Sequence, residues 1–594
     1  MLVGLAVLAY ALSAGHLDSV AWFQQMGGWC FPYASLLGKS TVLYTDGTHL
    51  ALPPLSFVVL HWIAPHAPTR FDEDVLCRVT SLLAPIVLYL GTRRRLPARV
   101  AFLSAAGILA LHPLGTLLYN QLCFLLACTG LVIALPAMTS RRSSRVRLAL
   151  AALFLALAVL TKQSCGAGAV AGVALALALF PATVPWRRRL VRCGALLAAT
   201  LAAVVVVGVA LTPYLSFPGM IRDVLVHGSD PKGTRVDLLE RLQDNVVSMA
   251  RTIAWLPLAI PSVLLLVAFV WRRPARESSA EPPGWVHVAM VSAVGIVAAL
   301  SPLLAWKGGL GVVKWLWSDA GLFLLGGERY WYLVVPAVVL LPLARRAGMP
   351  WAPPLIVASL PMYLAGMLSC PVVEWWSAWL DLWGRLWAPP LVFAGNAVAL
   401  TLVTMLLARR TRWMLAAQLF LGLEMACPYW IYTWHPRLAD EVYEPWPDVP
   451  ALGAMKVRRE LHGAHDAILA VRKLSDGPGD DVFWLPGDPP VEAYLERPRP
   501  ALSSPLVFMD QYDDRYVDQD VEALLAHPPK LIVLGPFPKP HIWPYFRREE
   551  EWGTMRLIDR VQRDLLPGRY ERLGILPWPD PKLTEGYLVY RRRR

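Results

Sequence analysis

The sequence has few charged residues and lacks the short motifs that mark many soluble enzymes. Only 17% of its 594 residues are charged, and its eight cysteines form no C-x-x-C pair and no cluster with histidine. It contains no Walker A loop, no G-x-S-x-G elbow and no Rossmann fingerprint in context. These absences argue against a zinc site, ATP-driven transport and serine hydrolase chemistry.

Long apolar runs are abundant instead. Hydrophobic residues make up 56% of the chain, and apolar runs recur from its start to about residue 432. This composition is typical of a polytopic membrane protein. The net charge of +13 comes from arginines clustered between the apolar runs, as in the cytoplasmic loops of membrane proteins. The basic charge therefore indicates which loops face the cytoplasm and does not indicate nucleic-acid binding. The clusters lie at 93–99, 141–147, 187–192, 271–276, 344–346 and 408–412.

Placing every arginine cluster in the cytoplasm predicts about thirteen membrane-spanning helices in a domain covering residues 1–432. The N-terminus then lies inside, and residues 16–74 form a first outer loop. The segment 53–65 is too short to span and is predicted to be a juxtamembrane helix at the outer surface. The predicted spans are 1–15, 75–92, 100–118, 121–138, 147–160, 165–182, 193–213, 252–271, 285–305, 330–343, 350–369, 389–408 and 412–431.

Polar residues gather on the outer side of this threading. Each has an ordinary explanation by itself: Lys162 could extend to the headgroups, Asp18 could be a solvated carboxylate, and Glu328 could pair with Arg329 at the surface. Polar groups at a membrane boundary are costly, so their placement on one side indicates a functional site. The candidates are Asp18, Tyr44, Asp46, His49, Tyr119, Asn120, Lys162, Gln163, Glu328, Arg329 and Tyr330.

The composition changes near residue 435, where prolines, acids and turns replace the apolar runs. Segments 465–495 and 522–537 each read as a helix, a turn and a buried strand, with a further helix after the strand in 465–495, and 586–592 reads as a final strand. Alternating helices and strands predict an α/β domain over residues 433–594. Because the last predicted span ends outside, we expect this domain to be extracytoplasmic.

The outer motifs occur in a recognisable order: Asp18 after the first span, then "VLYTDGTHLALPPL", "LLYNQL", "LTKQSCG" and "ERYWYLVVP". In this order the membrane portion resembles the GT-C glycosyltransferase superfamily, in particular the bacterial protein O-mannosyltransferases and the aminoarabinose transferase of lipid A. The resemblance implies an enzyme of the bacterial cytoplasmic (inner) membrane. It would transfer a hexose or pentose from a polyprenyl-phosphate donor to a lipid, glycan or protein acceptor, with inversion.

The resemblance also implies roles for particular residues. Asp18 matches the family's catalytic acidic position and would act as general base, with Asp46 as a second catalytic carboxylate. Lys162 and Arg329 would stabilise the lipid phosphate that leaves. The remaining candidates would bind sugar or acceptor: His49, Tyr44, Tyr119, Asn120, Gln163, Glu328 and Tyr330.

Two departures from the family pattern bear on metal use. The acidic pair of the family is here Asp18-Ser19, and the turn that often carries an aspartate carries Asn120. Each change removes a charge, so a divalent metal cofactor is doubtful and no metal ligands are predicted. Two alternatives remain open: a secondary transporter, and a non-catalytic lipid-binding or assembly protein that keeps the architecture without needing Asp18.

Overall fold

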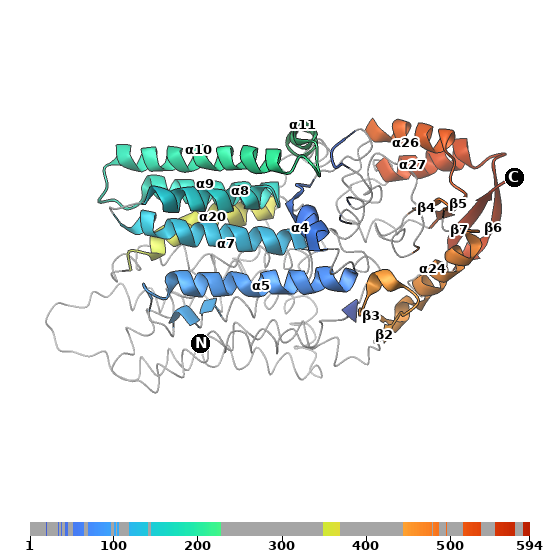
Figure 1. Cartoon of the computed structure of the whole chain (residues 1–594), viewed down its shortest axis with the longest axis horizontal. Coiled ribbons are helices and arrows are strands. Elements are labelled where there is room, and N and C mark those ends of the chain that lie inside the picture. Colours follow the sequence, from blue (N-terminus) through green and yellow to red (C-terminus); the bar gives the residue numbers. More distant parts are fainter. Residues whose placement is uncertain are drawn as a thin grey trace, which may run out of the picture.

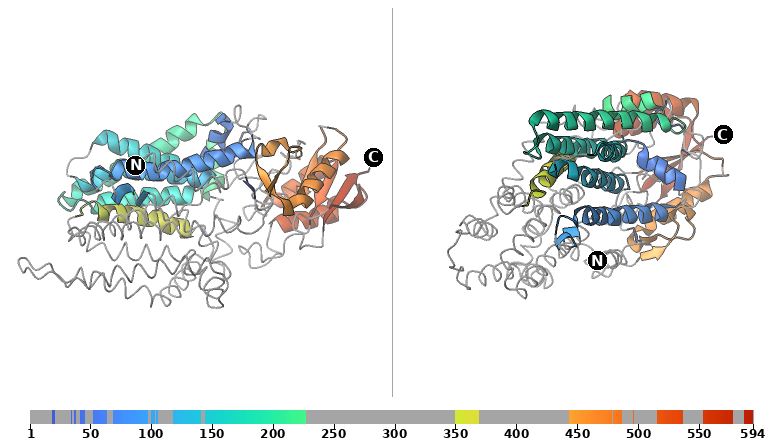
Figure 2. Two further views of the ribbon diagram at one scale, coloured as in Figure 1. Left: turned by 90° about the horizontal axis from the view of Figure 1, so that it is seen from below. Right: turned by 60° about the vertical axis from the view of Figure 1, so that its left-hand side comes forward.

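A computed structural model shows a bundle of helices joined at one end to a smaller unit that contains strands (Figure 1). Figure 2 shows the same arrangement from two further directions. The structure describes residues 19–20, 34, 37, 42–45, 52–63, 69–96, 100–102, 104–105, 118–140, 144–226, 349–368, 443–477, 479–485, 495, 515–535, 553–576 and 586–593.

Six helices of the described bundle coincide with predicted spans and confirm them as helices. The span 100–118 is described only in part, as helix, and the other six predicted spans lie outside the described residues, so the count of thirteen stays a prediction. Among the described helices, α5, α7 and α10 are long and apolar enough to cross a membrane. The bounds are α5 (Arg70–Thr92), α7 (Leu118–Thr139), α8 (Arg145–Val159), α9 (Gln163–Leu179), α10 (Trp186–Ala210) and α20 (Ala352–Leu368).

Helix α5 begins five residues earlier than the predicted span, at Arg70. The cause is a capping box at Thr69, whose backbone N–H and hydroxyl both donate to the Asp72 carboxylate, at 2.9 and 2.6 Å. The sequence prediction assigned these charged residues to the outer loop. The structure places them in the first turn of the helix instead.

Small residues let the bundle helices approach closely, as is common in membrane proteins. A Cβ on Gly172 of α9 would lie 2.0 Å from the Ala358 carbonyl oxygen of α20, and a Cβ on Gly91 of α5 would lie 2.0 Å from Val132 of α7. On α10, by contrast, apolar side chains such as Leu201 are well exposed. An exposed apolar face of this kind fits contact with lipid.

The two ends of the bundle differ in charge. Helices α5, α7 and α9 begin, and α8 and α10 end, on the side where the smaller unit sits (Figure 1). The basic residues Arg93–Arg95 follow α5, Arg145 opens α8, and Arg187–Arg189 lie in the first turn of α10, all at the opposite end. The described helices therefore keep the arginine-rich segments on one side, as the threading requires.

The predicted juxtamembrane helix is confirmed as a helix, α4 (Leu55–Ile63). Pro53 and Pro54, which belong to the predicted segment 53–65, precede the first residue of α4, and the Pro54 carbonyl accepts hydrogen bonds from the amides of Phe57 and Val58. The backbone N–H of Leu55 donates to the Leu160 carbonyl at 3.0 Å, which fixes the start of α4 to the end of α8. Trp62, half exposed, packs edge-on against Tyr214, at a ring-centroid distance of 6.1 Å.

The smaller unit contains a four-stranded sheet of order β4-β5-β7-β6, in which β4 and β5 are parallel and the other pairs antiparallel. The helix–turn–strand pattern and the final strand predicted from the sequence are confirmed. Strand β6 and helix α27 were not predicted. The bounds are α24 (His462–Leu474), β4 (Val482–Leu485), α26 (Arg515–Ala526), β5 (Leu531–Leu534), α27 (Gly553–Arg560), β6 (Tyr570–Leu576) and β7 (Tyr587–Arg592).

A second, three-stranded sheet joins distant parts of the chain. Strand β1 (Ser19–Val20) pairs in parallel with β3 (Lys456–Arg458), and β2 (Tyr443–Pro445) pairs with the other edge of β3. Near this sheet, Gly453 has a φ of 64° and packs against the Thr69 side chain at the start of α5. The predicted first outer loop, residues 16–74, therefore contributes a strand to the smaller unit.

Short helical turns complete the described structure. Two follow α10 at the end of the bundle that faces the smaller unit, two flank β3, and one follows α27. They are α11 (Phe217–Met220), η1 (Ile221–Val226), η3 (Pro450–Leu452), η4 (Arg459–Leu461) and η6 (Val561–Leu565).

Candidate functional site

The "LTKQ" segment forms a tight turn between α8 and α9 at the end of the bundle that faces the smaller unit. Leu160 closes α8 and Lys162 is the N-cap residue of α9, with an extended backbone. Gly166 makes the turn close, because a Cβ at this position would lie 2.4 Å from the Val159 backbone nitrogen. The local sequence therefore places Lys162 where the two helices meet and turns its side chain toward α7.

The Lys162 ammonium is buried between two residues of the "LLYN" segment. Its Nζ donates a hydrogen bond of 2.9 Å to Asn120 Oδ1 and lies 5.1 Å from the centroid of the Tyr119 ring. The Lys162 side chain is only 7% exposed. Both of these partners are neutral, and they hold the ammonium by its hydrogen bond and by the ring face. The cation is thus in a fixed position below the surface.

Asn120 has an amide nitrogen that points to a further ligand. Asn120 is fully buried, and its Nδ2 has no hydrogen-bond acceptor among the residues that the structure describes. Buried amide nitrogens normally have a partner because leaving one unpaired costs free energy. An anionic or hydroxyl-bearing ligand beside Lys162 would supply that acceptor.

Nearby side chains tie the turn to α7. The Cys123 thiol, one turn along from Asn120, donates to the Ala158 carbonyl at 3.4 Å. Gln163 opens α9 next to Lys162 and is half buried. Contacts among α7, α8 and α9 therefore hold the turn that carries Lys162.

Tyr44 lies at the same end of the bundle and holds an unusual backbone conformation. Its φ is 63°, a left-handed value that is uncommon for a bulky residue. Leu43 bridges to the turn after α10 through hydrogen bonds with Tyr214 and Ser216, and the Tyr44 hydroxyl donates to the Leu52 carbonyl at 2.5 Å. Burial, and then the nearby Asp223 carboxylate, raises the pKa of Tyr44. Tyr44 therefore acts here as a neutral anchor of the loop.

A buried group of charges on α5 was missed by sequence reasoning. Arg70 pairs with Glu73 at 3.5 Å, and Arg78 Nε pairs with Asp74 at 2.5 Å, with all four side chains buried. The string "TRFDEDVLCR" was the available signal, but starting the predicted span at residue 75 left most of it in a loop. Charged residues inside a helical bundle are costly and often mark a site.

The α5 charges lie near the level of the Lys162 site. Gly91 of α5 packs on Val132 of α7, and both helices start at the end that faces the smaller unit. Both helices rise by the same distance per residue, and Arg78 precedes Gly91 by as many residues as Tyr119 precedes Val132. Arg78 therefore lies about level with Tyr119. Two neighbouring helices thus carry their buried polar residues at the same depth.

Of the predicted site residues, the structure brings together Tyr119, Asn120, Lys162 and Gln163, and it places Tyr44 at the same end of the bundle. The others lie outside the described residues: Asp18, Asp46, His49, Glu328, Arg329 and Tyr330. Within the described part of the chain, one group of histidine and aspartate side chains is close enough to share a metal ion. It lies on α24, in the smaller unit, separate from Lys162.

No family model and no curated protein matches the sequence. Among solved structures, the fold is similar to an oligosaccharyltransferase of Archaeoglobus fulgidus with a tethered acceptor peptide, with a TM-score of 0.50 at 12% identity, covering 99% of this chain and 73% of that chain. The archaeal oligosaccharyltransferase AglB from Archaeoglobus fulgidus, with an inhibitory peptide and a dolichol-phosphate, gives 0.48 at 13% identity over 90% and 69%. ArnT from Cupriavidus metallidurans bound to undecaprenyl phosphate gives 0.41 at 11% identity over 99% and 97%.

The similarity to the oligosaccharyltransferase with the tethered acceptor peptide shows the class of fold. The chain has a polytopic membrane fold with a C-terminal domain after the helices. The resemblance noted from the order of the outer motifs is confirmed at the level of the fold.

Proposed function

We propose that this protein is a membrane glycosyltransferase that moves a sugar from a polyprenyl-phosphate donor to an acceptor, with inversion at the anomeric carbon. The reaction takes place at the outer face of the bacterial cytoplasmic membrane. The observation that carries the proposal is the buried Lys162 ammonium, held by Asn120 and Tyr119 at one end of a GT-C-type bundle.

The chemistry needs a fixed cation at this place. When the sugar leaves its carrier, negative charge develops on the lipid phosphate, and a pre-positioned cation in a water-poor site stabilises that charge. An ammonium that already has a neutral hydrogen-bond partner needs little reorganisation to accept a phosphate oxygen. The buried Asn120 Nδ2 would donate a second hydrogen bond to the same group.

The remaining roles in the proposed mechanism rest on the order of the motifs. Asp18 takes the proton of the acceptor hydroxyl as it attacks, and Asp46 and His49 bind hydroxyl groups or assist the proton transfer. Arg329 adds a second cation beside the leaving phosphate, and Glu328, Tyr330 and Gln163 contact sugar or acceptor. Tyr44 positions the loop that carries Asp46.

The proposed sidedness follows from charge. The arginine-rich ends of α5, α8 and α10 lie opposite the Lys162 turn, and such ends face the cytoplasm in most membrane proteins. The Lys162 site and the C-terminal domain then both face outward, where the head group of a lipid-linked donor would arrive. The solved oligosaccharyltransferase of similar fold carries an acceptor peptide, which supports a protein acceptor, alongside glycan and lipid acceptors, as a class to test.

A transfer assay tests the proposal. Purified full-length protein in lipid nanodiscs would receive a panel of undecaprenyl-phosphate hexoses and pentoses, and release of free undecaprenyl phosphate would be followed. Wild type would be compared with Asp18→Asn, with Asp559→Asn as the matched control because Asp559 is an exposed residue of α27. We expect turnover in wild type and the control, and loss of turnover in Asp18→Asn.

Two outcomes would change the proposal. Binding of lipid-linked sugar without turnover in any form would favour a non-catalytic lipid-binding protein. Full turnover in Asp18→Asn would support the transferase activity but show that Asp18 is not the general base. Asp46 would then be substituted next.

A further inference from the structure

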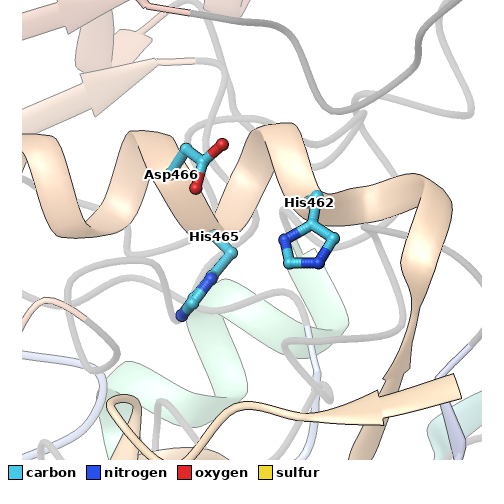
Figure 3. A group of neighbouring side chains, drawn as sticks. All are labelled: His462, His465 and Asp466. Atoms are coloured by element: carbon cyan, nitrogen blue, oxygen red, sulfur yellow. The ribbon is translucent and has the colours of Figure 1, made fainter.

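The first turn of α24 carries three potential metal ligands in the string "HGAHD", residues 462–466. His462 and His465 are three residues apart and Asp466 is four residues after His462, so helical geometry brings them to neighbouring positions. Figure 3 shows the three side chains around this turn. One ligand atom from each lies within 4.8 Å of the others.

Two further carboxylates approach the same histidines from the segment before α24. Glu444 of β2 lies 3.0 Å from His462 Nε2, and Asp448 lies 3.5 Å from His465 Nε2. Arg459 pairs with Glu444 at 2.5 Å. The group thus combines three carboxylates with one guanidinium, which favours a bound cation.

His465 is the most enclosed member of the group. Its ring stacks on Trp446, with centroids 4.6 Å apart and an interplanar angle of 28°, and its side chain is 13% exposed. Its buried Nε2 atom lies 3.5 Å from Asp448 Oδ2. The stacking on Trp446 and this contact hold the His465 ring in one orientation beside His462 and Asp466.

We propose that His462, His465 and Asp466 bind a divalent transition-metal ion of the zinc type, with Glu444 as the fourth ligand. Imidazole nitrogen and carboxylate oxygen are ligands that suit Zn²⁺. In tetrahedral coordination at about 2.0–2.1 Å, ligand atoms lie roughly 3.3 Å apart. Binding of the ion would bring the ligand atoms of His462, His465 and Asp466 closer together through rotation of side chains. The exposed ring of His462 is free to rotate, whereas the stacking on Trp446 keeps the His465 ring in place.

The ion would act as a structural clamp. Glu444 belongs to β2, which pairs with β3, and β3 pairs with β1 of the predicted first outer loop. A metal held by both Glu444 and α24 would therefore fix the sheet that joins the C-terminal domain to the beginning of the chain. Since binding to the folded state alone stabilises it, the melting temperature should rise with metal concentration.

Metal binding can be measured without any substrate, so its result is independent of the proposed transferase activity. The full-length protein would be purified in detergent through a histidine-free tag, stripped with a chelator and titrated with ZnCl₂ by calorimetry. CoCl₂ would be used in parallel because its visible absorption reports tetrahedral coordination. The variants are His462→Ala and His462→Ala/His465→Ala, with His527→Ala as the control, since His527 is an exposed residue after α26.

We expect one equivalent of Zn²⁺ to bind wild type and the control equally, with a metal-dependent rise in melting temperature. His462→Ala should weaken binding at least tenfold, and the double variant should lose both the site and the cobalt absorption. His462 is half exposed, so the single variant should fold normally, as elution volume and helical circular dichroism would show. Equal affinity and stoichiometry in wild type and the double variant, or no binding by wild type, would overturn the proposal.

Discussion

Replacing Lys162 by methionine is the sharpest test of the proposed site. Methionine keeps much of the length and apolar volume of the lysine stem but removes the ammonium that Asn120 holds at 2.9 Å. In the proposed reaction this ammonium contacts a phosphate oxygen whose charge grows as the sugar leaves. The variant therefore removes one charge-assisted hydrogen bond from the transition state.

The size of the effect follows from the energy of such a bond. A hydrogen bond to a charged group contributes about 1.5–3 kcal/mol. Each 1.4 kcal/mol changes an equilibrium or rate constant about tenfold. We therefore expect kcat/KM for a lipid-linked donor to fall about 10- to 150-fold, and the affinity for undecaprenyl phosphate to weaken by a smaller factor. Lys162→Arg should restore part of the loss because it keeps the charge in a larger group.

The assay compares Lys162→Met and Lys162→Arg with Lys473→Met, a control at an exposed lysine of α24. Lys162→Met also leaves the buried Asn120 oxygen without its donor, which costs roughly 1–3 kcal/mol of folding free energy. Melting temperatures are therefore measured beside activity. Unchanged kcat/KM and unchanged lipid-phosphate affinity in a folded Lys162→Met protein would refute the role of the ammonium.

Two further predictions concern folding. Gly166→Ala should destabilise the bundle by about 1–3 kcal/mol, because the new Cβ would meet the Val159 backbone nitrogen. The control is Gly194→Ala on α10, whose Cβ would meet nothing within 4 Å. It should leave the melting temperature unchanged or slightly higher. Asp480→Asn should destabilise the C-terminal domain by roughly 1–2 kcal/mol at pH 7, because the buried Asp480 carboxylate accepts a hydrogen bond from Lys530, and a thermal melt monitored over pH would show the loss.

The pH dependence of the Asp480 effect has a definite sign. Burial alone would raise the pKa of Asp480, but hydrogen bonds from Lys530 and from the Asp476 backbone N–H keep it below its ordinary value. A lowered pKa in the folded state means that the stabilisation is present above the unfolded-state pKa and is lost as the pH falls through the folded-state value. Wild type and Asp480→Asn should thus converge in acid. An equal difference in stability between wild type and Asp480→Asn at pH 7 and in strong acid would contradict this account. For the bundle, a Gly194→Ala variant as destabilised as Gly166→Ala would contradict the packing argument.

The sequence by itself determined those helices of the bundle that the structure describes, and their order. Hydrophobic runs of membrane length and the arginine clusters between them are local features, and the boundaries of α7, α8 and α9 fall within a few residues of the predicted spans. The start of α5 was missed because a charged segment was taken for a loop. Inside the bundle those charges pair with each other, so the helix can begin at Arg70.

The tertiary structure decided which polar residues meet. Lys162 and Asn120 lie forty-two residues apart, and only the packing of α7 against the α8–α9 turn brings them within hydrogen-bond distance. In the same way, the pairing of β1 with β3 and the stacking of Trp446 on His465 join segments whose sequences carry no sign of one another. Apolar patterning specifies an element because burial depends on each segment's own composition. A site depends on side chains from several elements, and their distances follow only from how those elements pack.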